Sequence, residues 1–358
     1  MGDFRSFKTA RRLPAEPMQP VVDPADWSPE SLKDVASWSY RLSDRDADEL
    51  ADGIKAARRA GVAIVDIKRE SFPLKAFGDV LIDVQRELTD GRGIVMMQNF
   101  PLDRFSREET AIAYVGLGSW LGETMSQNKL GHILGHVKDL GGDYNDPHTR
   151  GYMTTAEMRF HTDGCDYVGL LCLHPSKRGG ESRIASSATV YNRMLERRRD
   201  LVKVLTEDFY RSRSGEVSLG EQPYFKQPIF SFTNGYFSAT GVGAVIDKAQ
   251  QLPCVPKFTP AQKEAVEVYR QTVEESAVDI DFRRGDIQFL NNFVMLHTRR
   301  EYEDWPEEHR KRHLLRLWLH DPSGRVIPAE QRAGRFGRGV QIKGVARIAP
   351  LDVDADAA

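Results

Sequence analysis

Apolar positions follow a helical spacing in the first part of the chain and a strand-like pattern in the second. Phe77, Leu81, Val84 and Leu88 recur every three or four residues, which places them on one face of a helix. After residue 160, short apolar runs are bounded by Gly and Pro, as is typical of strands. Helices early and strands late predict an α+β protein with a mainly β core.

Typical N-terminal caps show where several helices begin. They are Ser43, Ser106 with Glu109, and Thr259 before Pro260. The expected helices cover 43–61, 77–88, 106–122, 187–205 and a segment from 260 onward. The expected strands cover 62–67, 94–97, 167–173, 278–282, 287–290 and 312–319, with a hairpin around Asn234-Gly235. This order is typical of a double-stranded β-helix, or jelly roll, with surrounding helices.

Composition divides the chain into three parts. Residues 1–40 contain five prolines and predict an extended N-terminal arm. Residues 41–325 predict a single domain, and residues 326–358 a C-terminal tail. Within the domain, the polar, glycine-rich stretch 123–150 predicts a long irregular loop, so we assign His132 and His136 to solvent-facing loop positions.

Overall composition excludes several classes of partner. Of 358 residues, 40% are hydrophobic and 28% charged, as in globular proteins. The net charge of -2 gives no basic field for nucleic acid. No apolar run approaches about 18 residues and no signal peptide is evident, so no membrane partner is expected. Three scattered cysteines fit reduced thiols in the cytoplasm, and the sequence leaves homo-oligomerisation open.

The most informative motif is His161-Thr162-Asp163. On a strand, residues two apart point to the same face, so this imidazole and carboxylate can share one metal ion. Two histidines and one carboxylate are typical ligands of non-haem Fe(II) in oxygenases. His297, which an apolar strand presents, is the best third candidate, ahead of His174, His309 and His313. A hydrogen-bonded core histidine is the alternative for His297.

Two arginines fall on one face of the last predicted strand. Arg312 and Arg316 would share that face with Leu314 and Trp318, while the opposite face is almost entirely apolar. A buried guanidinium needs an anionic partner, because an unpaired buried charge is very costly. That partner is either a ligand or an internal Asp or Glu, and the residues alone leave both interpretations open.

Taken together, these motifs resemble the TauD/TfdA-like family of Fe(II)- and 2-oxoglutarate-dependent dioxygenases, within the clavaminate-synthase-like superfamily. The resemblance covers about residues 90–320. It rests on four segments: His161-x-Asp163, Gly179-Gly180-Glu181-Ser182, Asn292 to His297, and Arg312-x-x-x-Arg316.

The resemblance implies a role for each motif. His161, Asp163 and His297 would bind iron, and Ser182 with Arg312 would bind the distal carboxylate of 2-oxoglutarate. The implied reaction uses O2, releases succinate and CO2, and ends in hydroxylation, desaturation or ring formation.

The expected substrate is a small molecule that bears a carboxylate, of which an amino acid is the commonest example. Arg316 would receive its carboxylate, and Glu157 or Asp166 its ammonium group. Taurine is not expected, because Glu157 and Arg159 stand where the sulfonate-oxidising members carry other residues.

Two other functions use the same ligands. One is a zinc- or manganese-dependent, cupin-like barrel enzyme, and the other is a metal-binding sensor without catalysis. The first leaves Arg312 and Ser182 without a role, and the second does not require Arg316.

Overall fold

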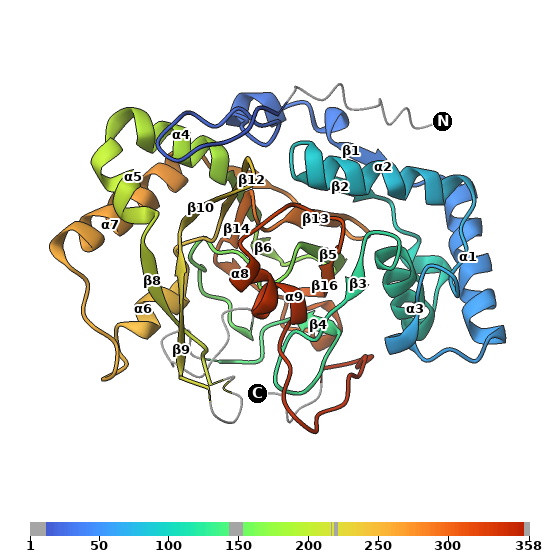
Figure 1. Cartoon of the computed structure of the whole chain (residues 1–358). Helices are drawn as coiled ribbons and strands as arrows, with labels where there is room; N and C mark the ends of the chain where they lie inside the picture. Colours follow the sequence, from blue (N-terminus) through green and yellow to red (C-terminus); the bar gives the residue numbers. More distant parts are fainter. Residues whose placement is uncertain (1–11, 143–152, 216, 218–220, 354–358) are drawn as a thin grey trace.

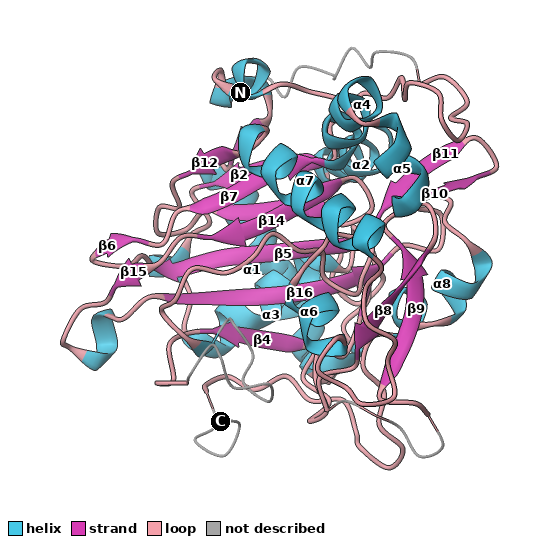
Figure 2. Ribbon diagram, turned by 90° about the vertical axis from the view of Figure 1, so that its left-hand side faces the viewer, coloured by secondary structure: helices cyan, strands magenta, loops and turns pink. Residues whose placement is uncertain are grey.

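Two β-sheets pack against each other at the centre of the computed structural model of this chain (Figures 1 and 2). The structure describes residues 12–142, 153–215, 217 and 221–353. The predicted arm, loop and tail are therefore described only in part. His148, a third histidine of the predicted loop 123–150, lies outside the described residues. The jelly-roll prediction, with a mainly β core and surrounding helices, is confirmed.

The larger sheet contains seven strands, and the smaller contains three. In the larger sheet the order is β1 (Ser39–Arg41), β2 (Ile94–Gln98), β13 (Ile287–Asn291), β5 (Tyr167–His174), β16 (His313–His320) and β3 (Glu123–Thr124), with β4 (Leu134–Val137) also on β16. The smaller sheet is β12 (Val278–Ile280), β7 (Ser182–Ser186) and β14 (Met295–Arg299). Three ribbons pair β10 (Phe230–Thr233) with β11 (Tyr236–Ala239), β6 (Arg178–Gly179) with β15 (Tyr302–Glu303), and β8 (Asp208–Ser212) with β9 (Tyr224–Pro228).

Alternation along β16 divides its side chains between two apolar layers. In β16, Trp318 points into the space between the sheets, where it packs with Ile184 of the smaller sheet. Leu317 and Leu319 point to the opposite face and join the core beneath the first helices. The expected two faces of this strand are therefore confirmed from Leu314 onward, although its register shifts between His313 and Leu314.

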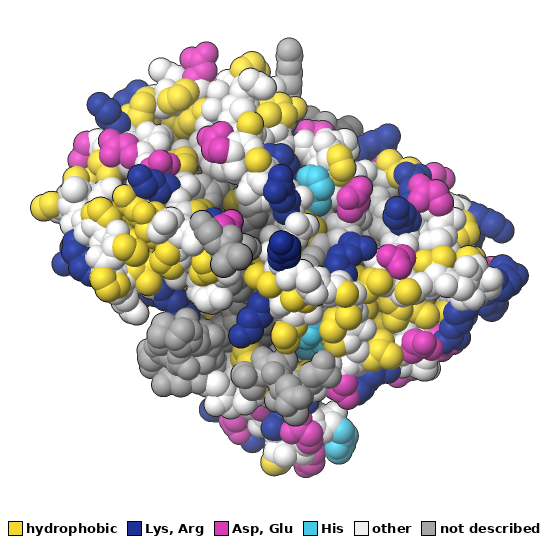
Figure 3. Space-filling model, turned by 60° about the horizontal axis from the view of Figure 1, so that its bottom comes forward, with side chains coloured by type: hydrophobic (Ala, Val, Ile, Leu, Met, Phe, Trp, Pro, Cys, Tyr) yellow, Lys and Arg dark blue, Asp and Glu magenta, His cyan; other side chains and the backbone are white. Residues whose placement is uncertain are grey.

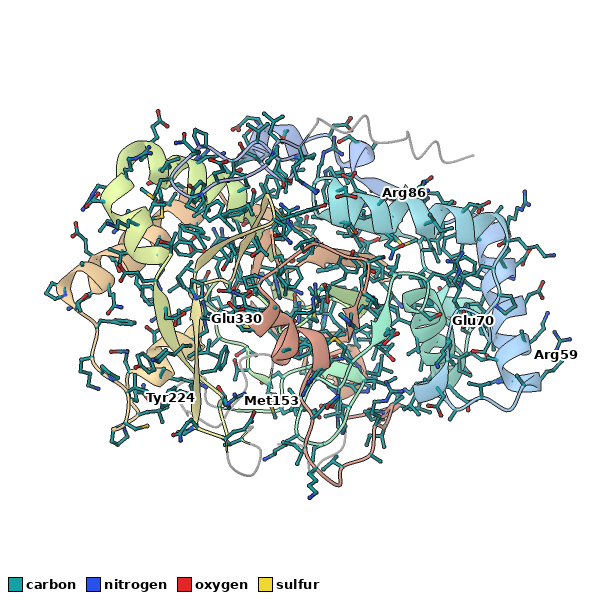
Figure 4. All side chains as sticks on the ribbon, viewed as in Figure 1. Arg59, Glu70, Arg86, Met153, Tyr224 and Glu330 are labelled. Carbon is teal, nitrogen blue, oxygen red and sulfur yellow. The ribbon has the colours of Figure 1, made fainter. Side chains whose placement is uncertain are left out.

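Helices cover the outer faces of both sheets. Figure 1 shows α1 (Asp44–Arg59), α2 (Ala76–Asp90) and α3 (Arg107–Gly118) on one side. On the other side lie α4 (Ser187–Arg197), α5 (Arg199–Leu205), α6 (Ala244–Ala249) and α7 (Pro260–Glu275), while α8 (Ala329–Ala333) and α9 (Arg335–Arg338) follow the last strand. The exposed Arg59 and Arg86 project outward from the helical layer (Figure 4). The capping boxes at Ser43, Ser106 and Thr259 are confirmed.

Three predictions about elements are wrong. Residues 62–67 form no strand; they connect two helices through a 3-10 turn, Ile64–Asp66, and pair with no strand of either sheet. The helix predicted over 187–205 is broken at Arg198, whose backbone is not helical. The stretch 123–150 is not wholly irregular, since it contains β3 and β4. Leu134 of β4 is buried and pairs with Leu317.

Both ends of the described chain pack on the domain. Arg325, after β16, forms a buried ion pair with Asp23 of the N-terminal segment. Further on, Ile348 forms a parallel bridge with His132. The domain boundaries at 40 and 325 stay predictions. In the described part of the chain, no helix has the length and apolarity needed to span a membrane.

Phe72 packs against both α1 and α3, and replacing it tests how much this packing contributes to stability. It is fully buried, and a Cβ at Gly53 or Gly116 would lie 2.6 or 2.4 Å from its ring. Phe72→Ala is expected to lower the free energy of unfolding by about 3–5 kcal/mol, because the cavity cannot close. Urea denaturation measures this, with the exposed Val345→Ala as control. A loss below about 1 kcal/mol would show that the helices close without it.

Candidate active site

Two histidines from distant parts of the chain are held side by side by a short backbone ladder. His161 and His297 form an antiparallel bridge in which each N–H donates to the other's carbonyl at 3.0 Å. Their ring centroids lie 4.4 Å apart. His161 forms only this isolated bridge and lies in no strand, whereas His297 is the middle residue of β14. The strand assumed around His161-x-Asp163 is therefore wrong.

Asp163 joins the two histidines because other residues hold it in place. Its backbone N–H donates to the side chain of Asn292 at 2.9 Å. Its Oδ2 accepts from Trp318 Nε1 at 2.9 Å and lies 3.8 Å from His297 Nε2. Burial alone would raise the pKa of Asp163, but the Arg316 charge, followed by the two imidazoles, holds this pKa far below its usual range. Asp163 is therefore an anion, as a metal ligand must be.

The three side chains form a group that fits one metal ion. Ligand atoms of His161, Asp163 and His297 all lie within 4.8 Å of one another. In the described residues, this is the one such group of His, Cys, Asp and Glu. Bonding between His161 Nδ1 and the Arg159 carbonyl, at 2.9 Å, leaves Nε2 for the metal. Burial, with the neighbouring His161 next, lowers the pKa of His297 to about 3, so this imidazole is neutral and able to ligate.

Arg316 contacts the proposed metal ligand and also lines the adjoining cavity. Its Nη1 donates to Asp163 Oδ2 at 3.3 Å, and its Nε donates to Gln127 Oε1 at 2.8 Å. Gln127 can reach Arg316 because position 135 is glycine. A Cβ at that position would lie 2.6 Å from Gln127 Oε1. The sequence left open whether Arg316 pairs with a ligand or with an acidic residue of the protein. The structure shows that it pairs with a protein carboxylate. That carboxylate is Asp163, and neither Glu157 nor Asp166 plays this part.

A second polar cluster lies between the sheets, around Arg312 and Ser182. Arg312 is buried, and its Nη1 has no hydrogen-bond partner within the described chain. Ser182 Oγ donates to Gln288 Oε1 at 2.9 Å and so connects the smaller sheet to the larger. The Gly179-Gly180 turn leaves room for the side chain of Arg312. Both glycines have positive φ, and a Cβ at Gly180 would lie 3.2 Å from Arg312 Nε.

Sequence reasoning missed two members of this second cluster, Gln288 and Arg299. Arg299 pairs with Ser182 across β7 and β14, and its guanidinium and that of Arg312 both lie over the ring of Tyr302. Burial, and next the Arg312 charge, lowers the pKa of Arg299 to about 10. Among the described atoms, Gln288 Nε2 and Arg299 Nε have no hydrogen-bond partner. Three buried donors of this cluster, counting Arg312 Nη1, thus have no partner in the described chain, which favours an anion as their ligand.

Signals for both missed residues were present in the sequence. Arg299 lies two residues after His297 on the same strand, so it shares the inward face. Gln288 is a polar residue between Ile287 and Phe289, and Leu290, two residues further along the same strand and so on the same face, belongs to the core between the sheets.

Glu157 and Asp166 lie elsewhere than expected. Glu157 lies 3.7 Å from Arg183, with half of its side chain exposed. Asp166 is buried against Arg332 and His320 at 2.7 and 2.9 Å. Neither residue lines the cavity beside the metal group, so the expected ammonium site is not found at these positions.

The other described histidines do not take part in the metal group. His136, predicted to be in a loop, is on β4, where its Nδ1 lies 2.8 Å from His313 Nε2. His132 is buried, contrary to the prediction that it faces solvent. None of the described histidines other than His161 and His297 belongs to the metal-ligating group.

A cavity of ≈ 180 Å³ opens beside this group. His161, Asp163, Arg316 and Trp318 line it on one side, and Arg211 and Gln227 of the β8–β9 ribbon on another. Figure 3 shows the face of the molecule that lies at the bottom of Figure 1, with Lys and Arg side chains around a central depression. The arrangement can hold a metal ion, an anion between the sheets, and a small molecule in the cavity.

Comparison with known proteins places this geometry in a family. The model of the family "Taurine catabolism dioxygenase TauD, TfdA family" matches residues 55–318. FR-33289 synthase of Streptomyces rubellomurinus is 26% identical over 324 residues, covering 89% of this chain and 96% of that protein. The taurine hydroxylase-like protein SAT17 of Stachybotrys chartarum is 27% identical over 289 residues, covering 77% and 73% respectively.

Solved structures share the fold at low sequence identity. Asparagine oxygenase in complex with Fe(II), (2S,3S)-3-hydroxyasparagine and succinate has a TM-score of 0.62 and 17% identity, covering 79% of this chain and 93% of that one. Non-haem iron oxygenase OrfP in complex with Fe, succinate and (3S)-hydroxy-L-Arg also has a TM-score of 0.62, with 14% identity and coverage of 87% and 99%.

Proposed function

The chain belongs to the TauD/TfdA family and is an iron(II)- and 2-oxoglutarate-dependent dioxygenase, and from that premise we propose which residues carry out the reaction. His161, Asp163 and His297 hold the iron, and Arg312 and Ser182 hold the distal carboxylate of 2-oxoglutarate. The observation that carries this proposal is the presence of a metal-ligating group together with a separate cluster of buried donors that have no partner in the described chain. A cupin-like enzyme or sensor that does not use 2-oxoglutarate leaves this donor cluster unexplained.

Iron held by this group would activate O2 together with 2-oxoglutarate. A C–H bond of the substrate would be oxidised, and succinate and CO2 would be released. The protein's own residues hold the metal ligands in position. Trp318 and Arg316 fix the carboxylate of Asp163 so that it presents an oxygen to the metal. The Arg159 carbonyl fixes the ring of His161. Such supporting bonds typically raise metal affinity 10- to 100-fold.

The donor cluster between the sheets explains the selection of a dicarboxylate. Two buried guanidiniums, Arg312 and Arg299, repel each other when no anion is present, and a carboxylate between them would offset one of the two positive charges. Ser182, which is bonded to Gln288, would donate to the same carboxylate after a hydroxyl rotation. Arg299 and Gln288 thus extend the clamp that Arg312 and Ser182 were expected to form alone.

The substrate is a small molecule that bears a carboxylate, and an amino acid is the first class to test. Arg316 lines the cavity and is the group proposed to receive that carboxylate. Asparagine oxygenase and OrfP, which share the fold, are complexed with 3-hydroxyasparagine and with hydroxylated arginine. A cytoplasmic location is proposed on the three cysteines, none of which forms a disulfide. A screen of amino acids and other small carboxylates for stimulated succinate formation tests the substrate class.

Arg316→Lys separates the proposed substrate contact from a purely structural role. Lysine retains the positive charge beside Asp163 but cannot reproduce the two-pronged contact of a guanidinium with a carboxylate. We expect uncoupled 2-oxoglutarate decarboxylation to persist while its stimulation by substrate falls at least about tenfold.

Succinate release with and without substrate measures this effect. Arg300→Lys is the control, because Arg300 pairs with Asp279 away from the cavity. If Arg316→Lys responds to substrate like the parent enzyme, Arg316 does not bind the substrate carboxylate.

A further inference from the structure

A second buried arginine lines the cavity from the β8–β9 ribbon. Arg211 is 4% exposed, and its two terminal nitrogens donate only to neutral oxygens. These are the carbonyls of Gly241 and Thr240 at 2.9 and 3.0 Å, and Thr240 Oγ1 at 2.7 Å. Its Nε has no hydrogen-bond partner among the atoms that the structure describes. Arg211 therefore retains both an uncompensated charge and an unused donor.

Gln227 adds another unused donor on the same face of this ribbon. Arg211 pairs with Phe225, which is two residues from Gln227, so the three side chains lie on one side of the ribbon. Gln227 is 4% exposed, and its Nε2 also lacks a partner within the described residues. All three residues line the cavity that adjoins the metal group. Lys248 of α6, which packs against β8, lines it as well.

The other arginines that line the cavity have acidic partners. Arg316 contacts Asp163 at 3.3 Å, and Arg159 lies 3.4 Å from Asp247. For Arg211, the described chain offers no carboxylate, and burial lowers its pKa to about 10. A buried guanidinium without an anion is costly. The missing counter-charge must come from outside the described chain, and the cavity is where a ligand would supply it.

Arg211 is also close to the metal ligands. It bonds to the carbonyl of Gly241, and a Cβ at Gly241 would lie 3.2 Å from the Cα of His161. A group bound by Arg211 would thus share the small cavity with a group bound by Arg316, on a different wall.

We infer that Arg211 and Gln227 form a binding site for a second oxyanion of the substrate, which is a carboxylate, sulfonate or phosphoryl group. This inference rests on the proposed function, because it places the first carboxylate at Arg316. The substrate class that it names is a small molecule with acidic groups at both ends. Such a substrate suits a cavity in which, among the described lining residues, the acidic one is Asp163, a proposed metal ligand.

Four amino acids of matched length test this site. L-Norvaline has a neutral end, whereas L-glutamate, L-homocysteate and 2-amino-4-phosphonobutyrate end in a carboxylate, a sulfonate and a phosphonate. Their binding is measured by calorimetry to enzyme loaded with Fe(II) and 2-oxoglutarate in the absence of O2. At least one anionic probe should bind about 10- to 150-fold more tightly than norvaline, as expected for hydrogen bonds to a charged group. The probe that binds most tightly identifies the oxyanion.

Three variants assign the preference to the site. In Arg211→Met and in Gln227→Leu, the preference for the anionic probe over norvaline should fall at least about tenfold. If Arg211→Met does not fold, Gln227→Leu alone tests the site. Lys226→Met should retain it, because Lys226 is exposed on the opposite face of the same ribbon, over the ring of Tyr210.

Two results would overturn the inference while leaving the proposed function intact. One is equal or absent binding of all four probes, and the other is a preference that survives in both site variants. Failure of the parent enzyme to bind 2-oxoglutarate with Fe(II) would instead contradict the proposed function itself.

Discussion

Replacing His297 by alanine should abolish both iron binding and turnover. His297 is the ligand that the smaller sheet presents, from the middle of β14, and its backbone holds His161 in place. Removing it leaves two ligands and a cavity where the third was. We expect iron affinity to fall by more than about 100-fold, because losing even a supporting residue typically costs 10- to 100-fold. Equilibrium dialysis against Fe(II) without O2 measures the loss.

The control for this substitution is His309→Ala. His309 is exposed and lies outside the metal-ligating group, so iron binding should be unchanged. Substitution of His161 or Asp163 should reproduce the loss seen for His297. Full iron binding and activity in any one of the three variants would show that the assigned group is not the metal site.

Arg312→Ala should weaken the binding of 2-oxoglutarate far more than the binding of iron. The substitution removes one partner of a buried charge pair, which costs about 3–5 kcal/mol, or about two to four orders of magnitude in the apparent KM for 2-oxoglutarate. Ser182→Ala should act in the same direction but more weakly, by about 1.5–3 kcal/mol. Arg299→Ala should fall between them, since its guanidinium lies over the same tyrosine ring as that of Arg312. Steady-state kinetics at saturating Fe(II) measures all three effects.

Iron titration of the same three variants provides the internal control. Each should bind Fe(II) like the parent, because none of the three belongs to the metal-ligating group. If the dependence on 2-oxoglutarate is unchanged in Arg312→Ala, the cosubstrate lies elsewhere and the donor cluster has another ligand.

The metal group could be predicted from sequence because its members have a fixed order and local spacing. His161 and Asp163 are two residues apart, so they remain adjacent whether or not a strand forms around them. The last strand was also predictable, because alternation alone separates Arg316 and Trp318 from Leu317 and Leu319.

Residues whose roles depend on long-range pairing could not be placed in this way. Glu157 and Asp166 lie close to the iron ligands in sequence, yet tertiary partners turn both away from the cavity. Conversely, Arg211 is remote in sequence and reaches the cavity only because β8 pairs with β9 and packs beside α6. A separation of about three or four residues along the chain was therefore not enough to place Glu157 and Asp166 in the cavity.

The release of succinate from 2-oxoglutarate, compared between the parent enzyme and Asp163→Ala, tests the central assignment most directly. With Fe(II) and O2, the parent should convert 2-oxoglutarate to succinate and CO2 in equal amounts. Asp163→Ala should release neither above background, because the carboxylate that Trp318 and Arg316 hold in place is gone. Zn(II) in place of Fe(II) should likewise give no succinate from the parent. Iron-dependent succinate release that is undiminished in Asp163→Ala, or none from the parent enzyme, would contradict the account.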